Sequence, residues 1–313
     1  MAVSREHKIL HGLSKASRVL EIGASFNPLV PKRKGWTSWT VDHATRAELV
    51  EKYTSDSSVD VSKIEEVDFV WADGALDSAV PTEMHGTFDA CVSSHAIEHI
   101  PDFVGFFVSL SKLLTPDGIV AMAVPDKRFC FDYFRPVSST GRILEAHLNG
   151  ATRHAFAARF DQLVYGCKKG EIIAWGQTPV GKMSLVTPSL AEARGLLSSL
   201  PSREYVDCHA WQFTPASFEL IILELQALGV IDFHVARSFP SAGCEFIVRL
   251  KKAVGNIATE VDREAQRMAL LERSVEELGE QADYLRARGG LGRPLARRWQ
   301  AYCRLRFMAV LLI

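Results

Sequence analysis

The chain has 313 residues, of which 47% are hydrophobic and 23% are charged, as in ordinary globular proteins. Its formal net charge of −1 offers no basic surplus to a nucleic-acid backbone, so we expect no nucleic-acid partner. The six cysteines are scattered without a C-x-x-C pair, which argues against a zinc knuckle or a disulfide framework and favours a cytoplasmic location. The first residues lack a long apolar core, so we expect no signal peptide, and we expect no membrane-spanning helix either.

The first part of the chain alternates short apolar runs with helical segments. The predicted strands span residues 18–22, 37–41, 67–71, 88–93 and 119–124. A helix within residues 1–17 is expected to lead into the first strand. Residues 102–114 place phenylalanines and leucines at helical spacing, and T-P-D-G at 115–118 ends that helix. This alternation predicts a parallel sheet with helices on both faces.

The rhythm breaks after the fifth strand and returns near the end of the domain. Residues 127–207 are rich in aromatic and basic side chains and are expected to form a mostly helical insertion. Thr214 and Pro215 then start a helix as its N-cap and first helical residue. Strands at 232–238 and 245–250 are separated by a short loop, which predicts an antiparallel hairpin.

The composition changes after Lys252, where apolar residues follow a 4–3 spacing. These residues are Val254, Ile257, Val261, Met268, Leu271, Val275, Leu278, Ala282 and Leu285, with Glu264 at one core position. The spacing predicts a coiled coil of about five heptads, through which residues 254–287 would form a dimer or trimer. The alternative is a single helix that docks on the domain of its own chain.

The last stretch, residues 289–313, is basic and partly apolar. It carries several arginines, has no acidic residue, and ends in A-V-L-L-I. A basic amphipathic helix of this kind can lie on an anionic membrane surface, so we expect contact with the inner face of the membrane through residues 291–313. The alternative is a tail that packs on the body or on a partner subunit.

The most informative stretch is R-V-L-E-I-G-A-S-F-N-P, where the first strand ends in a small-residue turn at Gly23 to Ser25. Such a turn in an α/β domain lets the backbone approach a nucleotide-like ligand closely. The dinucleotide fingerprint needs three glycines, and this turn has one. A nicotinamide-dependent dehydrogenase is therefore disfavoured.

Further polar residues follow the next three strands. Asp42 ends the second strand, Asp73 follows the third, and F-D-A-C-V-S-S-H-A-I-E-H-I runs through the fourth. In this order the motifs resemble the class I S-adenosylmethionine-dependent methyltransferases, over residues 15–126 and 208–252. The likeness is to type 11 methyltransferase domains, whose fourth strand reads like "FD-apolar-SxHVLEH", and P-D-K-R-F-C-F-D-Y-F-R-P resembles those found with bacterial glycan-assembly enzymes.

The resemblance implies a fold and a division of the chain. The fold is a Rossmann-like, doubly wound seven-stranded sheet with an antiparallel closing hairpin, a helical insertion after strand five and a C-terminal coiled-coil helix. Residues 1–252 would form the methyltransferase domain, with 127–207 as its inserted substrate or lid region. Residues 253–288 would be the coiled-coil helix, and 289–313 the basic tail.

The resemblance also implies S-adenosylmethionine as cofactor and names the residues around it. These are Glu21, Gly23, Ala24, Ser25, Asn27, Asp42, His43, Asp73, Gly74, Ala75, Ser93, Ser94 and His95. Asp42 would bond the ribose hydroxyls and Asp73 would lie near the adenine amine. His95 and His209 are the candidate general bases. The family's motif has glycines where Ser25 and Asn27 stand, which puts cofactor binding in some doubt.

Several of these residues have a structural interpretation as well. Asp42 could cap the following helix, Asp73 could serve a turn, and His95 could only line the wall of the site. Glu98 and His99 are expected to start or cap the next helix and to pack structurally. Asp126, Lys127 and Arg128 face the substrate pocket or pair among themselves. No metal site is expected, because His147, His154 and Asp161 lack a compact ligand spacing.

The function expected from the resemblance is methyl transfer, with a glycan or another small polar molecule as the O-methyl acceptor. The basic residues of the insertion suggest that the acceptor carries phosphate or carboxylate groups. These residues are Arg128, Arg135, Arg142, Arg153 and Lys168. The alternative is a catalytically silent methyltransferase fold that acts as a coiled-coil assembly or membrane-tethering module.

Overall fold

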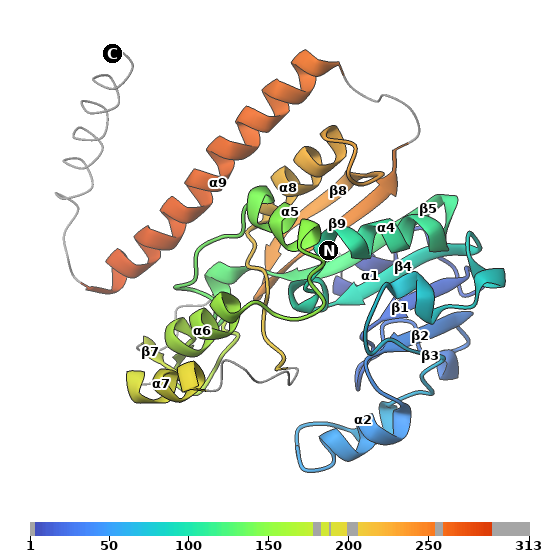
Figure 1. The fold of residues 1–313 in the computed structure, drawn as a ribbon, viewed down its shortest axis with the longest axis horizontal. Helices are drawn as coiled ribbons and strands as arrows, with labels where there is room; N and C mark the ends of the chain where they lie inside the picture. The colour runs from blue at the N-terminus through green and yellow to red at the C-terminus, as the bar shows by residue number, and fades with distance from the viewer. Residues whose placement is uncertain (1–3, 178–182, 188, 199–205, 254–258, 290–313) are drawn as a thin grey trace.

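A computed structural model describes residues 4–177, 183–187, 189–198, 206–253 and 259–289 (Figure 1). Its centre is a seven-stranded sheet with the strand order β3-β2-β1-β4-β5-β9-β8. The strands are β1 (Val19–Ile22), β2 (Ser38–Asp42), β3 (Phe69–Val70), β4 (Phe88–Ser94), β5 (Leu114–Pro125), β8 (Phe233–Ala242) and β9 (Glu245–Lys252). The first five are parallel, and β9 runs antiparallel to both β5 and β8. The predicted α/β class and the closing hairpin are confirmed.

Helices cover both faces of the sheet, as the alternation of elements predicts. The larger core lies under α3 (Leu76–Ala79), α4 (Phe103–Leu113) and α8 (Pro215–Ala227). Phe103 lies within 6.0 Å, ring centroid to ring centroid, of Phe107, Phe213 and Phe218, so α4 and α8 share one aromatic cluster. Burial of rings of this size dominates the stability of such a core.

Both long helices of this core begin at the residues that their sequences favour. Asp102 is the N-cap of α4, and its carboxylate accepts a hydrogen bond from the N–H of Gly105. Thr214 is the N-cap of α8 and forms a capping box with Ser217, with Pro215 in the first turn. Glu98 and His99 therefore do not start or cap the helix that follows them, and that expectation is wrong. They lie in a separate 3-10 turn, η4 (Ile97–His99).

The opposite face of the sheet carries a smaller core under α1 (Arg5–Leu10) and the loop after β1. Side chains alternate along β1, so Glu21 points to this face with Val19. The carboxylate of Glu21 is buried and accepts hydrogen bonds from the N–H groups of Leu29 (2.6 Å) and Val30 (3.1 Å). Glu21 thus fixes the loop that carries the turn at Gly23.

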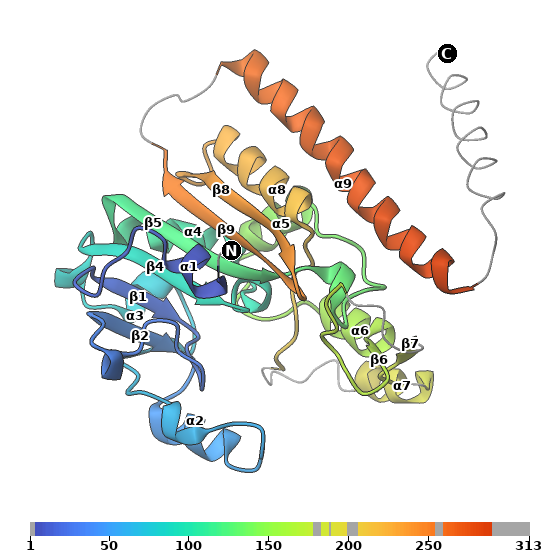
Figure 2. The ribbon, with the colours of Figure 1, turned by 180° about the vertical axis from the view of Figure 1, so that it is seen from behind.

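The segment after β5 contains α5 (Thr140–Leu148), α6 (Phe156–Tyr165), β6 (Cys167–Lys169), β7 (Met183–Leu185) and α7 (Leu190–Ser198). Helices predominate in it, as expected, but β6 and β7 add a short antiparallel sheet. In Figures 1 and 2, α6, α7 and this small sheet form a group of their own beyond the end of β5. Helix α2 (Arg46–Tyr53) follows β2 and is capped by Thr45.

The C-terminal helix α9 (Glu260–Gly289) lies along α8 in both views of the ribbon (Figures 1 and 2). Leu270 is buried in this contact, and Arg267 pairs with Glu224 of α8. The carboxylate of Glu277 accepts hydrogen bonds from the N–H of Ala216 in the first turn of α8. The helix therefore docks on the domain of its own chain, which is the alternative to a coiled coil that the sequence left open.

Docking leaves the predicted coiled-coil stripe open. Val261, Met268 and Val275 are seven residues apart, and their exposed fractions are 79%, 58% and 71%. The docked face is instead the neighbouring one, around Leu270. Residues 254–258 of the predicted coiled coil and the basic tail, 290–313, lie outside the described residues.

Within the described part of the chain, no helix combines the length and the apolar character that crossing a membrane requires.

A pH dependence of stability follows from the position of Glu21. Burial raises the pKa of this carboxyl from its ordinary value of 4.5 to about 7, although the two backbone hydrogen bonds act in the opposite direction. The native state then binds the proton more tightly than the unfolded chain. This group therefore stabilises the fold below about pH 5, and its contribution is lost as the pH rises through about 7.

We expect Glu21→Gln to abolish this part of the pH dependence. Relative to the variant, wild type should lose on the order of 3 kcal/mol of unfolding free energy between about pH 5 and about pH 8. Urea unfolding across this range measures the difference, with Glu83→Gln at an exposed position as the control. Parallel curves for wild type and Glu21→Gln would show that Glu21 is ionised in the native state throughout.

Candidate functional site

The carboxyl ends of four parallel strands meet at one edge of the sheet. Ile22 of β1 lies beside Val41 of β2 and Ser93 of β4, and Asp42 lies beside Val70 of β3. The residues that follow these strands therefore face the same region. Open α/β sheets bind their ligands at this edge.

The turn after β1 has two residues in the left-handed region. Gly23 has φ +68°, and its N–H donates to the carbonyl of Val41 at 2.8 Å. A Cβ on Gly23 would meet only the Cβ of Ala96, at an ordinary 3.6 Å, so the backbone angle and not the space favours glycine there. Ser25 takes φ 46°, which a glycine at this position would adopt without strain. Asn27, the other departure from the motif, is exposed and has no positive φ.

Asp42 closes this turn. Its buried carboxylate accepts the N–H of Ser25 (2.9 Å), the N–H of His43 (2.8 Å) and the Nδ1 of His43 (2.7 Å). The helix that follows has Thr45 as its N-cap, so Asp42 is not a helix cap. Three hydrogen bonds leave one of the roughly four acceptor positions of a carboxylate open.

The turn after β3, where the resemblance places the adenine, is exposed. Asp73, Gly74 and Ala75 all lie at the surface after β3, and Gly74 has φ +72°. The indole N–H of Trp71 donates to the carbonyl of Gly74 at 3.0 Å and holds this turn in shape. Asp73 thus stands in a turn that is open to a ligand, so its site role and its turn role are compatible.

The turn after β1 contains a polar atom that suits a polar ligand. The hydroxyl oxygen of Ser25 is buried and has no hydrogen-bond partner in the described chain. Ala24 beside it is buried, and of the two serines at the end of β4, Ser93 is buried and Ser94 accepts a hydrogen bond from Arg5 at 2.5 Å. A ligand with hydroxyl or carboxylate groups fits these residues.

His95 follows β4 directly and has a strained backbone, with φ 52°. Its N–H donates to the carbonyl of Ala123 in β5, and its Nε2 lies 2.9 Å from a carboxylate oxygen of Glu245. Glu245 of β9 is also ion-paired with Arg5 of α1. The His95 ring is therefore oriented by three elements of the fold.

The charges around His95 shift the pKa values of both His95 and Glu245. Burial acts to lower the pKa of His95, but the hydrogen bond to Glu245 and the nearby carboxylate of Glu98 outweigh it and raise that pKa. Burial acts to raise the pKa of Glu245, but its bonds to His95 and Arg5 lower that pKa to about 2. Glu245 is thus ionised at neutral pH.

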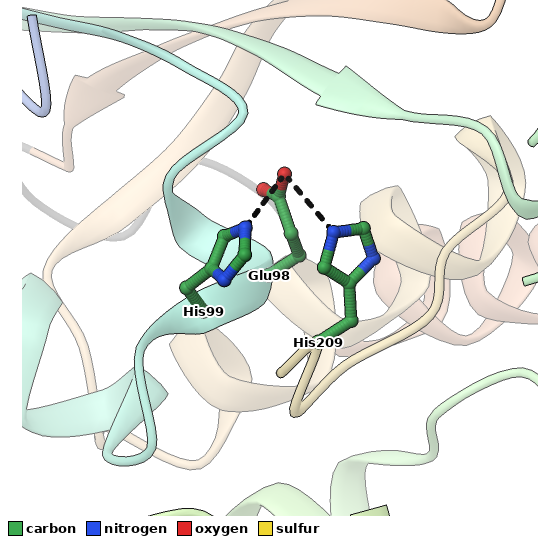
Figure 3. A group of neighbouring side chains, drawn as sticks. All are labelled: Glu98, His99 and His209. Carbon is green, nitrogen blue, oxygen red and sulfur yellow. Dashed lines mark ion pairs between the residues drawn. The ribbon is translucent and has the colours of Figure 1, made fainter. Parts of the chain in front are cut away.

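Glu98 lies at the centre of a group of imidazoles. Its side chain is fully buried, and its Oε1 lies 3.8 Å from Nδ1 of His95 and 3.9 Å from Nε2 of both His99 and His209. Figure 3 shows the carboxylate of Glu98 between the rings of His99 and His209. The two rings meet edge to face, with centroids 4.7 Å apart.

Carboxylates hold the far sides of the two flanking imidazoles. Nδ1 of His99 lies 3.0 Å from Asp207, and Nδ1 of His209 lies 2.5 Å from Asp132. Burial acts to raise the pKa of Asp132, but His209 and Arg135 outweigh it and lower that pKa. The pKa of Asp207 is likewise held below its usual range, because its hydrogen bonds to imidazoles outweigh its burial.

Backbone contacts bring His209 to Glu98. The N–H groups of Ala210 (2.7 Å) and Trp211 (3.2 Å) donate to the carbonyl of Glu98. The guanidinium of Arg135 donates to the carbonyl of His209 at 2.8 Å. The segment after the insertion is thereby fixed against the turn after β4.

The structure assembles residues that the motifs did not single out. Asp132, Asp207 and Glu245 complete the site, yet none of them stands at the end of a parallel strand. Two of them adjoin residues that did attract notice, since Asp207 precedes His209 by two positions and Asp132 lies in F-D-Y-F-R. An acid beside a candidate histidine is the signal that could have found them.

Other candidates are used structurally. His147 pairs with Asp102 and His154 with Asp207, so the His147, His154 and Asp161 set is not brought together in the described structure. Asp126 and Arg128 form a buried ion pair, and Arg128 also reaches Glu280 of α9.

Much of the basic character of the insertion is likewise consumed within the chain. Arg128 and Arg135 are held by Asp126 and Asp132, and Lys168 pairs with Glu171. The case for an anionic acceptor is therefore weaker than the sequence suggested.

A cavity of about 430 Å³ adjoins the histidines on the side of the insertion. It is lined by Phe131, Arg159, Gln162, Leu163, Gly166, Ile173, Val186, Thr187, Val206, Asp207 and Cys208. Because Asp207 bonds His99 and Cys208 precedes His209, this cavity opens beside the Glu98 group. Its volume lies within the roughly 300–1,000 Å³ of small-molecule sites.

Residues 22–122 match a family model described as a methyltransferase domain. This stretch is a methyltransferase domain. It includes the Gly23 turn, Asp42 and His95, and its cofactor is S-adenosylmethionine, which supplies a methyl group on a sulfonium centre. No curated protein matches the chain.

Solved structures resemble this chain distantly. One from Rhodobacter sphaeroides, named as a Zn-dependent alcohol dehydrogenase, shares 13% identity over 81% of this chain and 92% of that one, with a TM-score of 0.42. The 1,6-didemethyltoxoflavin-N1-methyltransferase of Burkholderia thailandensis shares 16% identity over 80% of this chain and 78% of that one, with a TM-score of 0.36. A methyltransferase of Aquifex aeolicus shares 12% identity over 80% of this chain and 95% of that one, with a TM-score of 0.38. Similarity of this degree does not distinguish one activity from another.

The contacts of Asp42 predict how cofactor binding responds to substitution. One open acceptor position can take one ribose hydroxyl, and a second hydroxyl requires the half-exposed His43 ring to turn away. We expect Asp42→Ala to weaken S-adenosylmethionine binding about 10- to 100-fold, because hydrogen bonds to a charged group are lost. His43→Ala should keep the affinity or raise it a few-fold.

Isothermal calorimetry with S-adenosylmethionine and its demethylated product measures both effects. Asp117→Ala, at an exposed position near the start of β5, is the matched control and should bind as wild type does. Equal affinity of Asp42→Ala and wild type would remove Asp42 from the cofactor site.

Proposed function

We propose that this chain transfers a methyl group from S-adenosylmethionine to a hydroxyl of a small polar acceptor of the glycan type. The observation that carries the proposal is the group of three imidazoles around the buried carboxylate of Glu98, at the edge of the sheet where the methyltransferase turn lies. A neutral amine or an ionised acid is already nucleophilic, whereas a hydroxyl must lose a proton to become a good nucleophile.

His95 is the residue that we assign as the proton acceptor. Its Nε2 is held by the ionised Glu245, so Nδ1 carries the free lone pair and faces the interior of the group. With 38% of its side chain exposed, it is also the most accessible of the three imidazoles around Glu98. His209 is more deeply buried and held by Asp132, so we assign it to holding the site together.

The reaction then balances as an in-line displacement. The acceptor oxygen forms a bond to the methyl carbon while the bond from that carbon to sulfur breaks. The hydroxyl proton passes to Nδ1 of His95, and the sulfur leaves as a neutral thioether. The protein contributes mainly by positioning the two reactants and excluding water.

The cavity beside the Glu98 group supports a sugar-like acceptor. Phe131 offers an aromatic wall, while Arg159, Gln162 and Asp207 offer donors and acceptors for hydroxyl groups. A pyranose ring presents apolar C–H faces and a rim of hydroxyls, which this mixture matches. The likeness of P-D-K-R-F-C-F-D-Y-F-R-P to glycan-assembly methyltransferases points the same way.

We expect His95→Asn to reduce methyl transfer at least about 100-fold, the usual worth of a general base, while cofactor binding is unchanged. Asparagine tolerates the left-handed backbone of His95, so the variant should fold. The assay follows labelled methyl from S-adenosylmethionine into glycan and lipid extracts. His147→Asn, at a histidine paired with Asp102, is the matched control.

The outcomes separate the proposal from its alternative. Transfer at the wild-type rate by His95→Asn would remove His95 as the base. Wild type that binds no cofactor and transfers no methyl would favour the silent fold, with assembly as the main role.

We also propose that the chain self-associates through the stripe of Val261, Met268, Leu271 and Val275 on α9. These side chains are exposed although they are apolar, and they follow the 4–3 spacing of coiled coils. Docking on α8 uses a different face, so a second copy could pair with the stripe while α9 stays docked. We further propose that the chain is located in the cytoplasm. Residues 291–313 would then contact the inner face of the membrane.

Val275→Lys combined with Met268→Lys should abolish self-association, because a charge at a core position is costly to bury. Ala269→Lys adds a lysine at an exposed position away from the stripe and should leave the assembly intact. Analytical ultracentrifugation over a range of concentrations measures the mass. A monomeric wild type would contradict this proposal and leave docking as the only role of α9.

A further inference from the structure

The carboxylate of Glu98 has no hydrogen-bond partner. Both of its oxygens are buried, and neither is bonded to any group in the described chain. The nearest nitrogens, on His95, His99 and His209, are 3.8 to 3.9 Å away, which is beyond hydrogen-bond reach. A buried carboxylate normally receives several hydrogen bonds or a cation. Glu98 receives no hydrogen bond in the described chain, and its ion-pair contacts with the three imidazoles are long, so both of its oxygens can still accept a cation.

The tautomers of His99 and His209, which flank Glu98, also indicate a site that can take a cation. Nδ1 of His99 and Nδ1 of His209 face the carboxylates of Asp207 and Asp132, which can only accept. Each Nδ1 therefore carries the proton, and in the neutral ring the lone pair lies on Nε2. Both Nε2 atoms face Glu98, so three electron-rich atoms converge on one buried point (Figure 3).

We propose that Glu98, His99 and His209 bind one divalent transition-metal ion. The three ligand atoms lie within 4.8 Å of one another. A tetrahedral zinc site with bonds of about 2.0–2.1 Å separates its ligand atoms by about 3.4 Å. The 3.9 Å separations at Oε1 exceed this by a few tenths of an ångström, which small rotations of the side chains can close.

The surroundings match those of known metal centres. Metal-binding histidines usually donate their second N–H to a carboxylate, which fixes the ring and its tautomer. Here both histidines do so, and Arg135 holds the carboxylate of Asp132 at 2.7 Å. Two imidazoles and one carboxylate suit zinc, iron, cobalt or manganese and disfavour magnesium. Three protein ligands also leave a position open, as in catalytic sites.

The open position gives the ion a role that rests on the proposed function. Nδ1 of His95 faces the same oxygen of Glu98, so an acceptor hydroxyl bound to the ion would lie beside the proposed base. Coordination lowers the pKa of a bound hydroxyl, and the proton would pass to His95. The ion-binding site itself is independent of methyl transfer.

Calorimetric titration of the chelator-treated full chain with Zn²⁺ alone tests the site. We expect one equivalent to bind with micromolar or tighter affinity, and Co²⁺ to give the visible absorption of a four- or five-coordinate ion. Glu98→Gln and His209→Asn should each weaken Zn²⁺ at least about 100-fold. Asp132→Asn leaves all three ligands in place and should weaken it about 10- to 100-fold. His147→Asn should bind as wild type does.

A second readout guards against misfolding. Glu98→Gln removes an unpartnered buried charge, so its metal-free form should melt no lower than metal-free wild type, while losing the rise in melting temperature that Zn²⁺ gives. No binding of Zn²⁺ or Co²⁺ by wild type would overturn the site. One equivalent bound equally by wild type, Glu98→Gln and His209→Asn would overturn it too, as adventitious binding elsewhere.

Cofactor calorimetry on the same samples keeps the two proposals apart. Zn²⁺ binding without S-adenosylmethionine binding would sustain the metal site and contradict the methyltransferase proposal. S-adenosylmethionine binding and methyl transfer without Zn²⁺ binding would support the methyltransferase proposal and contradict the metal site.

Discussion

The carbonyl of Glu98 accepts hydrogen bonds from the N–H groups of Ala210 and Trp211, and the whole site depends on this contact. It joins the turn after β4 to the segment that returns from the insertion. Without it, His209 would not face Glu98, and Asp132 would have no imidazole to hold. A backbone contact is well suited to this task, because it fixes the chain whatever the side chains bind.

The electrostatics of the site follow from that juxtaposition. His99 and His209 each lie between two carboxylates, one that bonds Nδ1 and one, Glu98, that faces Nε2. The outer carboxylates are stabilised by their partners, and Arg135 adds a fully buried positive charge behind Asp132. Glu98 receives no hydrogen bond from the imidazoles, and its contacts with them are longer, at 3.8 to 3.9 Å. The site thus concentrates negative charge at one buried point beside the edge where a methyltransferase domain holds its cofactor.

The fold was largely predictable because its signals are local. Apolar runs of four to six residues mark the strands, and the capping residues Asp102 and Thr214 mark the helix starts. The sequence did not decide between partners where a local pattern allowed two. The heptads of α9 describe an apolar stripe but not the neighbouring face, which docks through Leu270 and the pairs with α8. Glu98 and His99 also resembled the start of a helix until the structure placed them in a turn of their own.

The sequence by itself determined the class of the fold, its methyltransferase motifs and the residues at the ends of its parallel strands. Gly23, Asp42 and His95 could be found because parallel strands always bring their carboxyl ends to one edge. Only the tertiary structure decided which groups complete the site. Asp132 and Asp207 come from the insertion and Glu245 from the last strand, and no periodicity or spacing encodes their distance from His95 or Glu98. Contacts across the fold depend on how the insertion packs against the sheet, and that packing is set by many weak interactions at once.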